Sequence, residues 1–496
     1  MGQSPPLVNS RSVAAGFGWV ALCSYSNRIL GLVSTLVLAK VLTPSDFGLV
    51  AVAAMMLEVI QLVKDMGLSE AVIYNKRQDR ATLDTAHTIL VGYNVLLFIG
   101  AAAAAPFIAR FYDSPTLLPV VLLMSSTLVV NSLRVVPITL IRKNLDYRTL
   151  VVPEVVPVTV SALVSIAMAL MGFGVWSLVI KSLIQSFMAV WLLNMVSSFR
   201  PRFGFDRAAA RELLGYGRFV AGTSVLLVVL YNIDRFYVSS VVGIAALGVF
   251  GLAMQIAELP IRQFSFLVGA VMFPIMSTME RSGPALKNVF LKTLKYTASV
   301  TLPAAVGISI FGPSLMHALY GPRWDSIADP LRIVAVYAAL RSLSSVIYDL
   351  YKATGNPHIM QRLCFFKLAM VGGLGIPALQ AYGLVGMSAL LVLTYGLSLV
   401  WELYELARIL LTSYMSVVRV LIKPAALSVT VIPAVYWVAT LLAPMESLWQ
   451  VALAMVVAGF TYVGLLFAVD REASRDVKAF WSSKRVPAPQ AEPSIL

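Results

Sequence analysis

The fold of this chain is decided by the stretch VLAKVLTPSDFGLVAVAAMMLEV at residues 37–59, because it recurs as YVSSVVGIAALGVFGLAMQIAEL at residues 237–259. The two copies align without a gap at an offset of 200 residues. The matched residues are Val41 and Val241, Gly48 and Gly248, Ala53 and Ala253, and Glu58 and Glu258. A later match, between Gly174 and Gly383 at an offset of 209 residues, extends the similarity. The sequence therefore predicts two structurally related halves.

Apolar runs like these two recur along almost the whole chain. Of its 496 residues, 59% are hydrophobic and only 12% are charged, whereas soluble domains have about 45–50% apolar and 25% charged residues. Between Phe17 and Phe467, runs of about 20 residues follow one another, and each is long enough to cross a hydrocarbon core of about 30 Å as a helix. The composition excludes a soluble protein. It predicts an all-α polytopic membrane protein with about 14 transmembrane helices.

The number of spans between the two copies predicts how the halves are related. Six predicted spans separate them, an even number, so both copies enter the membrane in the same sense and form a parallel repeat. We expect a six-helix N-lobe at residues 1–200 and a six-helix C-lobe at residues 201–415. Two further helices follow at residues 416–469, and a polar cytoplasmic tail follows at residues 470–496.

Lysine and arginine gather in the connections on one side of the predicted membrane. On that side lie Lys76, Arg77, Arg80, Arg142, Lys143, Arg148, Arg200, Arg202, Arg207, Arg211, Arg281, Lys287, Lys352 and Arg408, with further basic residues in the tail. The positive-inside rule then places both termini in the cytoplasm. Much of the net charge of +14 follows from this asymmetry, so we expect no nucleic-acid partner.

Charged residues also lie inside the predicted spans, where an Arg, Lys or Asp costs about 2.5–3.5 kcal/mol on insertion scales. The basic ones are Arg28, Arg134, Lys181, Arg235, Arg262, Lys295, Arg332, Arg341 and Lys367. The acidic ones are Glu58, Asp234, Glu258, Asp349 and Glu402. The excess is positive, and a cavity lined in this way would attract an anion. Phosphate and pyrophosphate are the groups that arginine binds best.

Two arginines are the strongest candidates for binding such an anion. Arg28 lies about ten residues from either end of its predicted span, too deep to reach the headgroups easily. Arg341 is similarly central in the span at residues 328–351, although Asp349, two turns further along a similar face, can partly offset its charge. Lys367 is a further candidate.

The acidic residues are candidates for a gate or for ion coupling. Glu58 lies mid-span without a basic residue three or four positions away, so it can carry a proton or help to hold a sodium ion, or it can pair with Arg28. Asp234 and Arg235 are neighbours about 100° apart on a helix, so each needs another partner.

Glu258 is a gate or coupling candidate as well, but a simpler interpretation is available for it. Arg262 follows it at i+4 on the same helix face, in the favourable order, so the two side chains are expected to neutralise each other.

The sequence lacks the signatures of common enzymes. There is no Gly-x-x-x-x-Gly-Lys-Ser/Thr loop for nucleotide hydrolysis and no Gly-x-Ser-x-Gly elbow. The three histidines are far apart, which argues against a metal cluster. We therefore expect neither an enzyme nor a bound cofactor, apart from a coupling ion such as H⁺ or Na⁺.

Several stretches, taken in order, carry a resemblance to a known family. They are LVLAKVLTPSDFGL at 36–49, DMGLS at 65–69, NIDRF at 232–236, LGVFGLA at 247–253, MFPIMS at 272–277, YGPRW at 320–324 and LYKATGNP at 350–357. The chain resembles the Wzx-type polysaccharide flippases of the multidrug/oligosaccharidyl-lipid/polysaccharide exporter superfamily, especially the exporters of exopolysaccharide repeat units. The likeness extends over essentially the whole chain.

The resemblance implies a MATE-like, V-shaped arrangement of the two six-helix lobes in a bacterial inner membrane. It implies a substrate of undecaprenyl-pyrophosphate-linked oligosaccharide, moved from the cytoplasmic to the periplasmic leaflet for exopolysaccharide or lipopolysaccharide assembly. It also implies that basic residues in a central cavity bind the pyrophosphate, with Arg28 and Arg341 as the matching positions and Arg235 behind them. A polysaccharide polymerase or export machinery is the partner that it implies.

Other functions stay open at the level of the sequence. A drug/cation antiporter of the same superfamily would need an acidic cavity, and the charge count argues against it. A peptidoglycan lipid-precursor flippase shares the need to bind an anion. A membrane-embedded glycosyltransferase or polymerase would need catalytic carboxylates or a large outside loop. The energy can come from ion coupling at Glu58 or from consumption of the flipped lipid.

Overall fold

The computed structural model describes most of the chain between residues 26 and 469. The described residues are 26–27, 30–31, 33–63, 80–143, 147–197, 199–200, 202–207, 210, 229–277, 279, 283–441 and 448–469. Arg28 and the predicted tail at residues 470–496 lie outside them.

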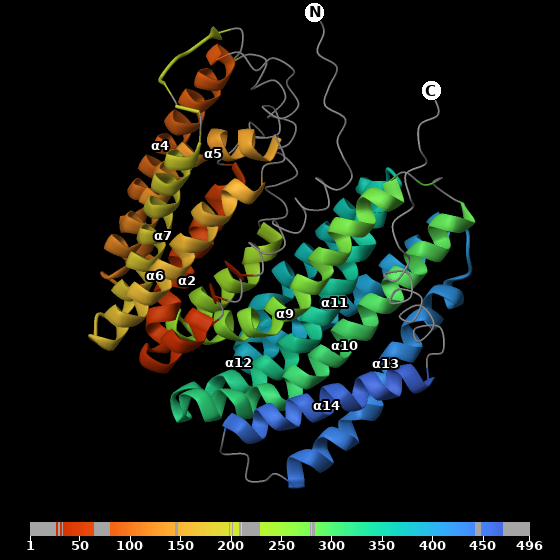
Figure 1. The fold of residues 1–496 in the computed structure, drawn as a ribbon. Coiled ribbons are helices and arrows are strands. Elements are labelled where there is room, and N and C mark those ends of the chain that lie inside the picture. Colours follow the sequence, from red (N-terminus) through yellow and green to blue (C-terminus); the bar gives the residue numbers. More distant parts are fainter. Residues whose placement is uncertain are drawn as a thin grey trace, which may run out of the picture. The chain divides into compact units, whose positions relative to one another are not determined.

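Every long element among these residues is a helix (Figure 1). The α-helices are α2 (Pro44–Val63), α4 (Arg80–Phe111), α5 (Leu117–Lys143), α6 (Val151–Leu170), α7 (Val175–Val196), α9 (Ile244–Ser277), α10 (Pro284–Tyr320), α11 (Ala328–Ala353), α12 (Pro357–Ile409), α13 (Tyr414–Leu441) and α14 (Leu448–Val469). Single turns lie at η1 (Tyr147–Leu150), η2 (Val238–Val242) and η3 (Pro322–Ile327). The prediction of an all-α fold is confirmed.

The length and composition of these helices fit a membrane. Within the described ranges, eight helical segments are long and apolar enough to span one. One of them is α12, which contains both predicted spans at residues 361–381 and 383–404. The protein is therefore a multi-span membrane protein, while the count of fourteen helices stays a prediction.

Local chemistry sets the start of α2. Pro44 is its first residue, where a missing N–H costs nothing. Thr43, the residue before it, exchanges two hydrogen bonds with Asp46. The amide of Thr43 donates to Asp46 Oδ2 at 2.9 Å, and the amide of Asp46 donates to Thr43 Oγ1 at 3.3 Å. This reciprocal pairing is a capping box, which fixes where the helix begins.

The first turns of α2 and α9 cross at two glycines. A Cβ placed on Gly48 would lie 1.9 Å from the carbonyl oxygen of Ile244, and a Cβ on Gly248 would lie 2.0 Å from the carbonyl oxygen of Pro44. Pro44 and Ile244 are themselves separated by 200 residues, as the two glycines are. Each copy of the repeat therefore contacts the other through the same positions, as two copies about a twofold axis do.

A second glycine pair has the same unusual backbone in both copies. Gly174, between α6 and α7, has φ 55° and ψ −133°, and Gly383, inside α12, has φ 56° and ψ −140°. Only glycine adopts this conformation readily. At Gly383 it breaks α12 into two helices, where the sequence places a boundary between spans. The offset of 209 residues is thus confirmed at the level of the backbone.

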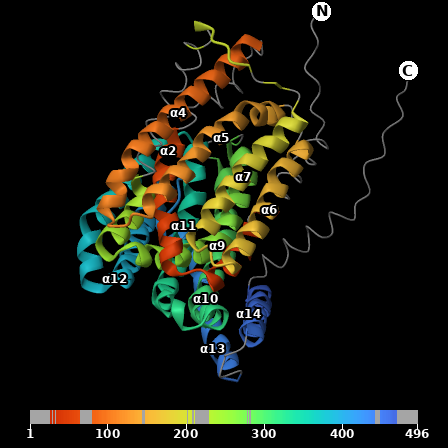
Figure 2. The same ribbon diagram turned by 90° about the vertical axis from the view of Figure 1, so that its left-hand side faces the viewer.

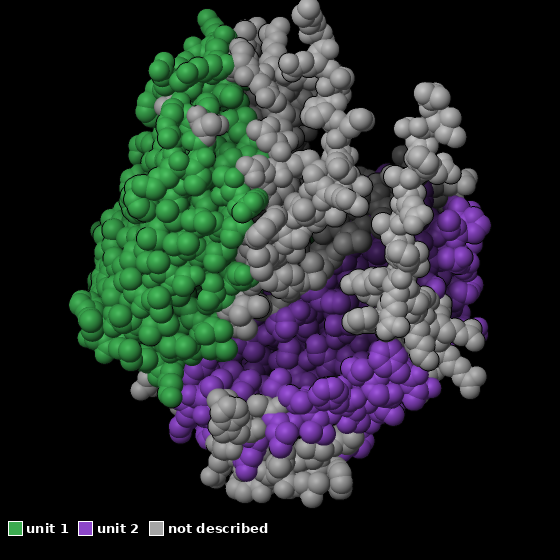
Figure 3. Space-filling view, viewed as in Figure 1, with its two compact units in different colours: residues 1–253, 364–390 green, residues 254–363, 391–496 purple. Residues whose placement is uncertain are grey.

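The chain divides into two compact units (Figure 3). Unit 1 comprises residues 1–253 and 364–390, and unit 2 comprises residues 254–363 and 391–496. The long helices α9 and α12 contribute residues to both. This division is not the pair of lobes expected at residues 1–200 and 201–415, whose boundaries stay a prediction.

Each unit is a bundle of helices. In unit 1, α4 packs against α5, α5 and α6 both pack against α7, and α2 contacts α5 and α7 (Figures 1 and 2). In unit 2, α10 packs against α11, α13 and α14. The core of unit 2 includes the buried side chains of Phe290, Leu294, Ile347, Leu350, Tyr351 and Leu406. Close packing of this kind holds membrane helices together where hydrophobic burial cannot.

The glycine crossing can be tested with two substitutions in one helix. We expect Gly248→Ala to destabilise the protein by about 1–3 kcal/mol, because its methyl group would meet backbone that cannot move aside. Gly251→Ala is the matched control: a Cβ there meets nothing within 4 Å, and alanine favours helix by about 0.5–1 kcal/mol. Thermal unfolding of the purified variants measures both. Equal midpoints would show that the crossing is not tight.

Candidate functional site

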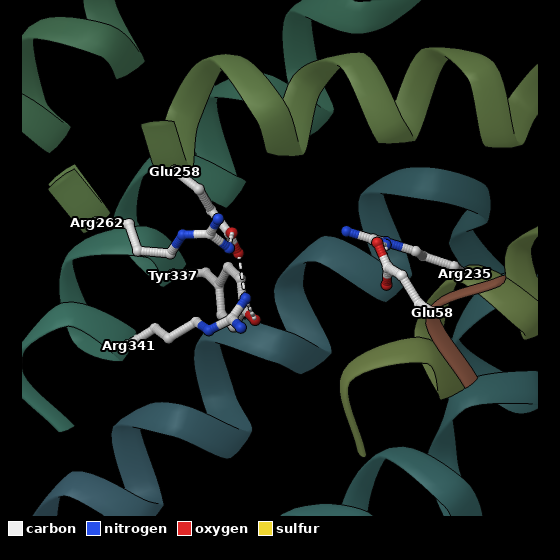
Figure 4. A network of polar contacts seen from close by, with 6 residues as sticks. All are labelled: Glu58, Arg235, Glu258, Arg262, Tyr337 and Arg341. Atoms are coloured by element: carbon white, nitrogen blue, oxygen red, sulfur yellow. Dashed lines mark hydrogen bonds and ion pairs between the residues drawn. The ribbon is translucent and has the colours of Figure 1, made fainter. Parts of the chain in front are cut away.

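Glu258 of α9 holds two arginines from unit 2 (Figure 4). Arg341 of α11 donates from Nη1 to Glu258 Oε1, and its Nη1 also donates to the hydroxyl of Tyr337 at 3.3 Å. Arg262 Nη1 lies 3.6 Å from Glu258 Oε2. We call these four residues the Glu258 cluster. The predicted pairing of Glu258 with Arg262 is confirmed.

The Glu258 cluster has one positive charge in excess. One carboxylate faces two guanidinium groups, so the sum of the three formal charges is +1. The Glu258 side chain is 11% exposed and that of Arg341 is 23% exposed, whereas Arg262 is 61% exposed. Because the carboxylate is almost buried, its attraction for the arginines is weakly screened by water. The arrangement can hold both cations in a membrane and still attract an anion.

The ion pair of Arg341 is formed with Glu258, and a partial offset of its charge by Asp349 stays a prediction. Asp349 does not accept the hydrogen bond that Glu258 accepts from Arg341. Its Oδ1 instead accepts a hydrogen bond from Lys352 Nζ at 3.3 Å, one turn further along α11. The reason is geometric: a carboxylate on the neighbouring helix α9 reaches Arg341 directly, which a residue two turns away on the same helix cannot do.

A second ion pair joins Glu58 of α2 to Arg235 in unit 1 (Figure 4). Arg235 Nη1 lies 3.2 Å from Oε1 and 3.0 Å from Oε2 of Glu58. The pair is half-exposed, with 31% of the arginine and 48% of the glutamate side chain accessible. Arg235 thus finds the acidic partner that Asp234 cannot be. Pairing of Glu58 with Arg28 falls outside the described residues.

The two matched glutamates differ because the repeat places different residues opposite them. Ser132-Leu133 recurs as Ser342-Leu343 at an offset of 210 residues, and this match sets Asn131 at the position of Arg341. Asn131 is neutral, and its Nδ2 donates to Ser186 Oγ at 3.2 Å. The repeat therefore gives Glu58 no cation equivalent to Arg341. Glu58 instead binds Arg235, which lies outside the repeated stretch at residues 37–59.

The other predicted site residues are buried within unit 1. Asp234 is 5% exposed, and Lys367 of α12 is 1% exposed. Such burial removes both side chains from ready contact with a bulky substrate. Arg28, the first sequence candidate, is not among the described residues.

Lys181 of α7 is a further cation inside a span, outside the predicted binding residues. Its Nζ donates to Ser34 Oγ at 2.7 Å, and Ser34 itself is 2% exposed. Among the described residues, no ion pair includes Lys181. A charge held by a neutral hydroxyl keeps its attraction for an anion. The signal was present in the sequence as a lone lysine inside an apolar span.

Glu402 is fully buried and serves to join helices. Its Oε1 accepts hydrogen bonds from Ser398 Oγ at 2.8 Å and from the Tyr348 hydroxyl at 3.1 Å. Its backbone carbonyl accepts one from the Tyr351 hydroxyl at 2.7 Å. These bonds tie α11 to the second part of α12. Within the described ranges, no three His, Cys, Asp or Glu side chains are placed to hold a metal ion.

The strengths of the two ion pairs can be compared by double-mutant cycles. For Glu258→Gln with Arg341→Met we expect a coupling above about 1 kcal/mol, because both side chains are mostly buried. For Glu58→Gln with Arg235→Met we expect less than about 1 kcal/mol, as for exposed pairs. Thermal unfolding of the single and double variants gives both values. The reverse order would contradict the ranking by burial.

Comparison with known proteins identifies similar sequences. The model of a family described as a polysaccharide biosynthesis protein matches residues 37–329. The succinoglycan biosynthesis transport protein ExoT of Rhizobium meliloti is 21% identical over 380 residues, which are 77% of this chain and 76% of that protein. The lipopolysaccharide biosynthesis protein WzxC of Escherichia coli is 22% identical over 384 residues, 75% of this chain and 76% of that protein. The teichuronic acid biosynthesis protein TuaB of Bacillus subtilis is 23% identical over 337 residues, 67% and 70% of the two chains.

Solved structures share the fold at low sequence identity. The lipid II flippase MurJ in an inward closed conformation has a TM-score of 0.74 at 14% identity, over 90% of this chain and 98% of that one. An inward-facing multidrug resistance MATE transporter of the MOP superfamily has a TM-score of 0.59 at 14% identity, over 78% and 96% of the two chains. These likenesses show the fold alone.

The resemblance to polysaccharide exporters that the sequence motifs indicate is confirmed by these relatives. The family model covers more than half of this chain. The chain therefore belongs to the family of polysaccharide biosynthesis proteins.

Proposed function

We propose that the protein is a flippase for undecaprenyl-pyrophosphate-linked oligosaccharide repeat units. It moves them from the cytoplasmic to the periplasmic leaflet for exopolysaccharide or lipopolysaccharide assembly. The names of the relatives mention three different polymers, succinoglycan, lipopolysaccharide and teichuronic acid, and one of them is called a transport protein. The observation that carries the proposal is the excess positive charge of the Glu258 cluster in a multi-span membrane fold.

The chemistry of the cluster suits a pyrophosphate. Guanidinium groups bind phosphate oxygens in pairs of parallel hydrogen bonds, and Arg262 and Arg341 share the carboxylate of Glu258. A pyrophosphate can therefore bind to the exposed guanidinium of Arg262 and compete with Glu258 for Arg341. The glycan would lie in the polar space between the lobes while the lipid tail stays in the bilayer. Rocking of the lobes would then change the side of access.

Further cations would complete the binding site. Lys181, held by the Ser34 hydroxyl, offers a positive charge in unit 1, and no described carboxylate forms an ion pair with it. Arg235 must be released from Glu58 before it can bind an anion fully. Arg28 remains a proposed binding residue on the strength of its central place in the sequence of its span. Lys367, which is almost fully buried, is the weakest of the candidates.

Ion coupling would act through the exposed pair. Protonation of Glu58 would remove the charge that holds Arg235, and an anion on Arg235 would in turn favour protonation of Glu58. Binding of H⁺ or Na⁺ at Glu58 and binding of substrate would then be linked. Asp234 and Glu258 are further gate candidates. Consumption of the flipped lipid by a polymerase is the alternative source of energy.

The proposal includes a location. We place the protein in the bacterial inner membrane with both termini in the cytoplasm, because the basic connections gather on one side. A polysaccharide polymerase or export machinery on the periplasmic side would take over the flipped lipid. The charge balance of the Glu258 cluster argues against a drug/cation antiporter, since a cation would be repelled by it.

The anion-binding role can be tested in a strain that lacks this gene. We expect the lipid-linked repeat unit to accumulate, and the intact protein to restore export. Arg341→Gln should lower export about tenfold or more, because a hydrogen bond to a charged group is worth about 1.5–3 kcal/mol. The lipid-linked pool and the surface polysaccharide are measured together.

The matched control is Arg332→Gln in the same helix. Arg332 lies in an exposed pair with Asp329 at 3.1 Å, so its loss should leave export unchanged. Arg28→Ala and Lys181→Met extend the series. An unchanged lipid-linked pool in the deletion strain would refute the substrate, and equal export by both arginine variants would refute the role of Arg341.

Coupling can be tested in proteoliposomes with an imposed pH or sodium gradient. If Glu58 carries the coupling ion, the gradient should accelerate flipping by the intact protein but not by Glu58→Gln. Glu154→Gln is the control, because Glu154 forms an ion pair with Arg134 that the coupling does not use. Flipping by the intact protein that ignores both gradients would favour consumption of the product as the energy source.

A further inference from the structure

A short segment outside the helices is bound to the first turns of α4. We call residues 202–207 the strap. Every second backbone amide of the strap donates to α4: Arg202 to Asp84 Oδ1 at 3.1 Å, Gly204 to Thr88 Oγ1 at 3.1 Å and Asp206 to Thr85 Oγ1 at 2.9 Å. The strap is therefore fixed along its whole length by one helix.

The acceptors on α4 are themselves held in place. Thr85 and Thr88 donate from their hydroxyls to the carbonyl oxygens of Ala81 and Asp84, four residues earlier. Asp84 is 8% exposed and Thr85 is fully buried. Because hydroxyl oxygens that donate to the helix backbone point in one direction, they present fixed acceptors to the strap.

The strap presents an aromatic and basic face. Alternate amides point toward α4, and alternate side chains of an extended segment share one face, so Phe203 and Phe205 lie together. Arg207 follows them as the first helical residue. Phe203 is 76% exposed and Phe205 is 67% exposed. Arg202 and Arg207 are exposed as well. One edge of Phe203 contacts the ring of His87, with the ring centroids 5.9 Å apart, and the rest of it is uncovered.

The position of the strap is set by two membrane-spanning helices. It begins six residues after the end of α7 at Val196 and is bound to the start of α4 at Arg80. Both helices are candidate spans. Between α7 and the strap, Arg200 donates to the carbonyl oxygens of Asn194 and Ser197, so it closes the end of α7. The strap therefore lies at the level where the hydrocarbon core ends.

A lipid-facing stripe of α7 leads toward the strap. Phe187, Trp191 and Met195 are spaced by four residues on one helix face, and each is more than half exposed. Exposed apolar side chains at this spacing on a spanning helix face lipid. The stripe ends one turn before Arg200, and the aromatic residues of the strap continue it in the sequence.

We propose that the strap is an anchor for the anionic phospholipid surface of the leaflet at this end of the helices. Phe203 and Phe205 lie among the headgroups, where aromatic rings are favoured, and Arg207 binds lipid phosphates. Asp206 is the only acid in the strap, so its net charge is +1 and Arg200 adds a further positive charge beside it. The anchor would hold this connection against the membrane surface whatever substrate the protein carries.

The experiment uses full-length protein in lipid nanodiscs, with both cysteines replaced by alanine and one spin label per variant. The label is placed at Phe205→Cys, at Asp206→Cys on the opposite face of the strap, and at Phe107→Cys. Phe107 is 72% exposed in the last two turns of α4, at the other end of the helix from the strap, and serves as the reference for contact with lipid. Accessibility to oxygen reports lipid, and accessibility to a water-soluble nickel chelate reports water.

We expect oxygen accessibility to exceed nickel accessibility at position 205, as at position 107, and the reverse at position 206. Adding phosphatidylglycerol to phosphatidylcholine should increase the immersion of position 205, and Arg207→Gln should reduce this effect about fivefold. Nickel accessibility at both strap positions would overturn the anchor. Low accessibility to both reagents at position 205 would overturn it as well, since it would show that protein covers the strap. The variant labelled at position 107 gives the values of a residue in contact with lipid, and a single symmetric peak in size-exclusion chromatography shows that each variant is folded.

Discussion

The crossing of α2 and α9 at Gly48 and Gly248 is the constraint on which the arrangement of charges depends. Backbone meets backbone there, because each glycine faces a carbonyl oxygen at a distance that no side chain tolerates. Membrane helices gain little from hydrophobic contact with each other, so such close approach supplies the packing that joins them. Glu58 and Glu258 each follow their crossing glycine by ten residues on the same helix. The crossing therefore fixes the start of both helices that carry these acids.

From this equivalent start the two copies diverge in the partners of their acids. Glu258 is almost buried and is shared by Arg262 and Arg341, whereas Glu58 is half-exposed and binds Arg235. Burial lowers the screening by water, so the first arrangement is held firmly and the second exchanges partners more easily. The same position of the repeat thus carries two arrangements: a cation cluster in unit 2, and in unit 1 a more exposed pair that we propose a proton or an anion opens.

The sequence predicted what depends on local spacing and on repetition. The helical class, the matched glycines and the pairing of Glu258 with Arg262 follow from periodicity, offset and the i, i+4 rule. The partner of Glu58 could not be found in this way, because Arg235 is 177 residues distant and comes from another helix. The ion pair of Arg341 with Glu258, 83 residues away, was hidden for the same reason: only contacts along one helix are visible in a sequence. The hydroxyl that holds Lys181 is 147 residues away, so its role was equally hidden.

A binding site for a pyrophosphate in a membrane must satisfy two opposed conditions. Bare arginines in an empty site would be costly in a medium of low dielectric, while arginines fully matched by carboxylates would no longer attract an anion. A carboxylate shared by two guanidinium groups meets both conditions. It lowers the cost of burying the two cations, and the sum of the three formal charges stays positive, so that the group still attracts an anion. In the Glu258 cluster the more exposed arginine, Arg262, is the one at the longer distance from the carboxylate. Arg262 is therefore both the arginine that an incoming anion reaches first and the one that Glu258 releases most easily.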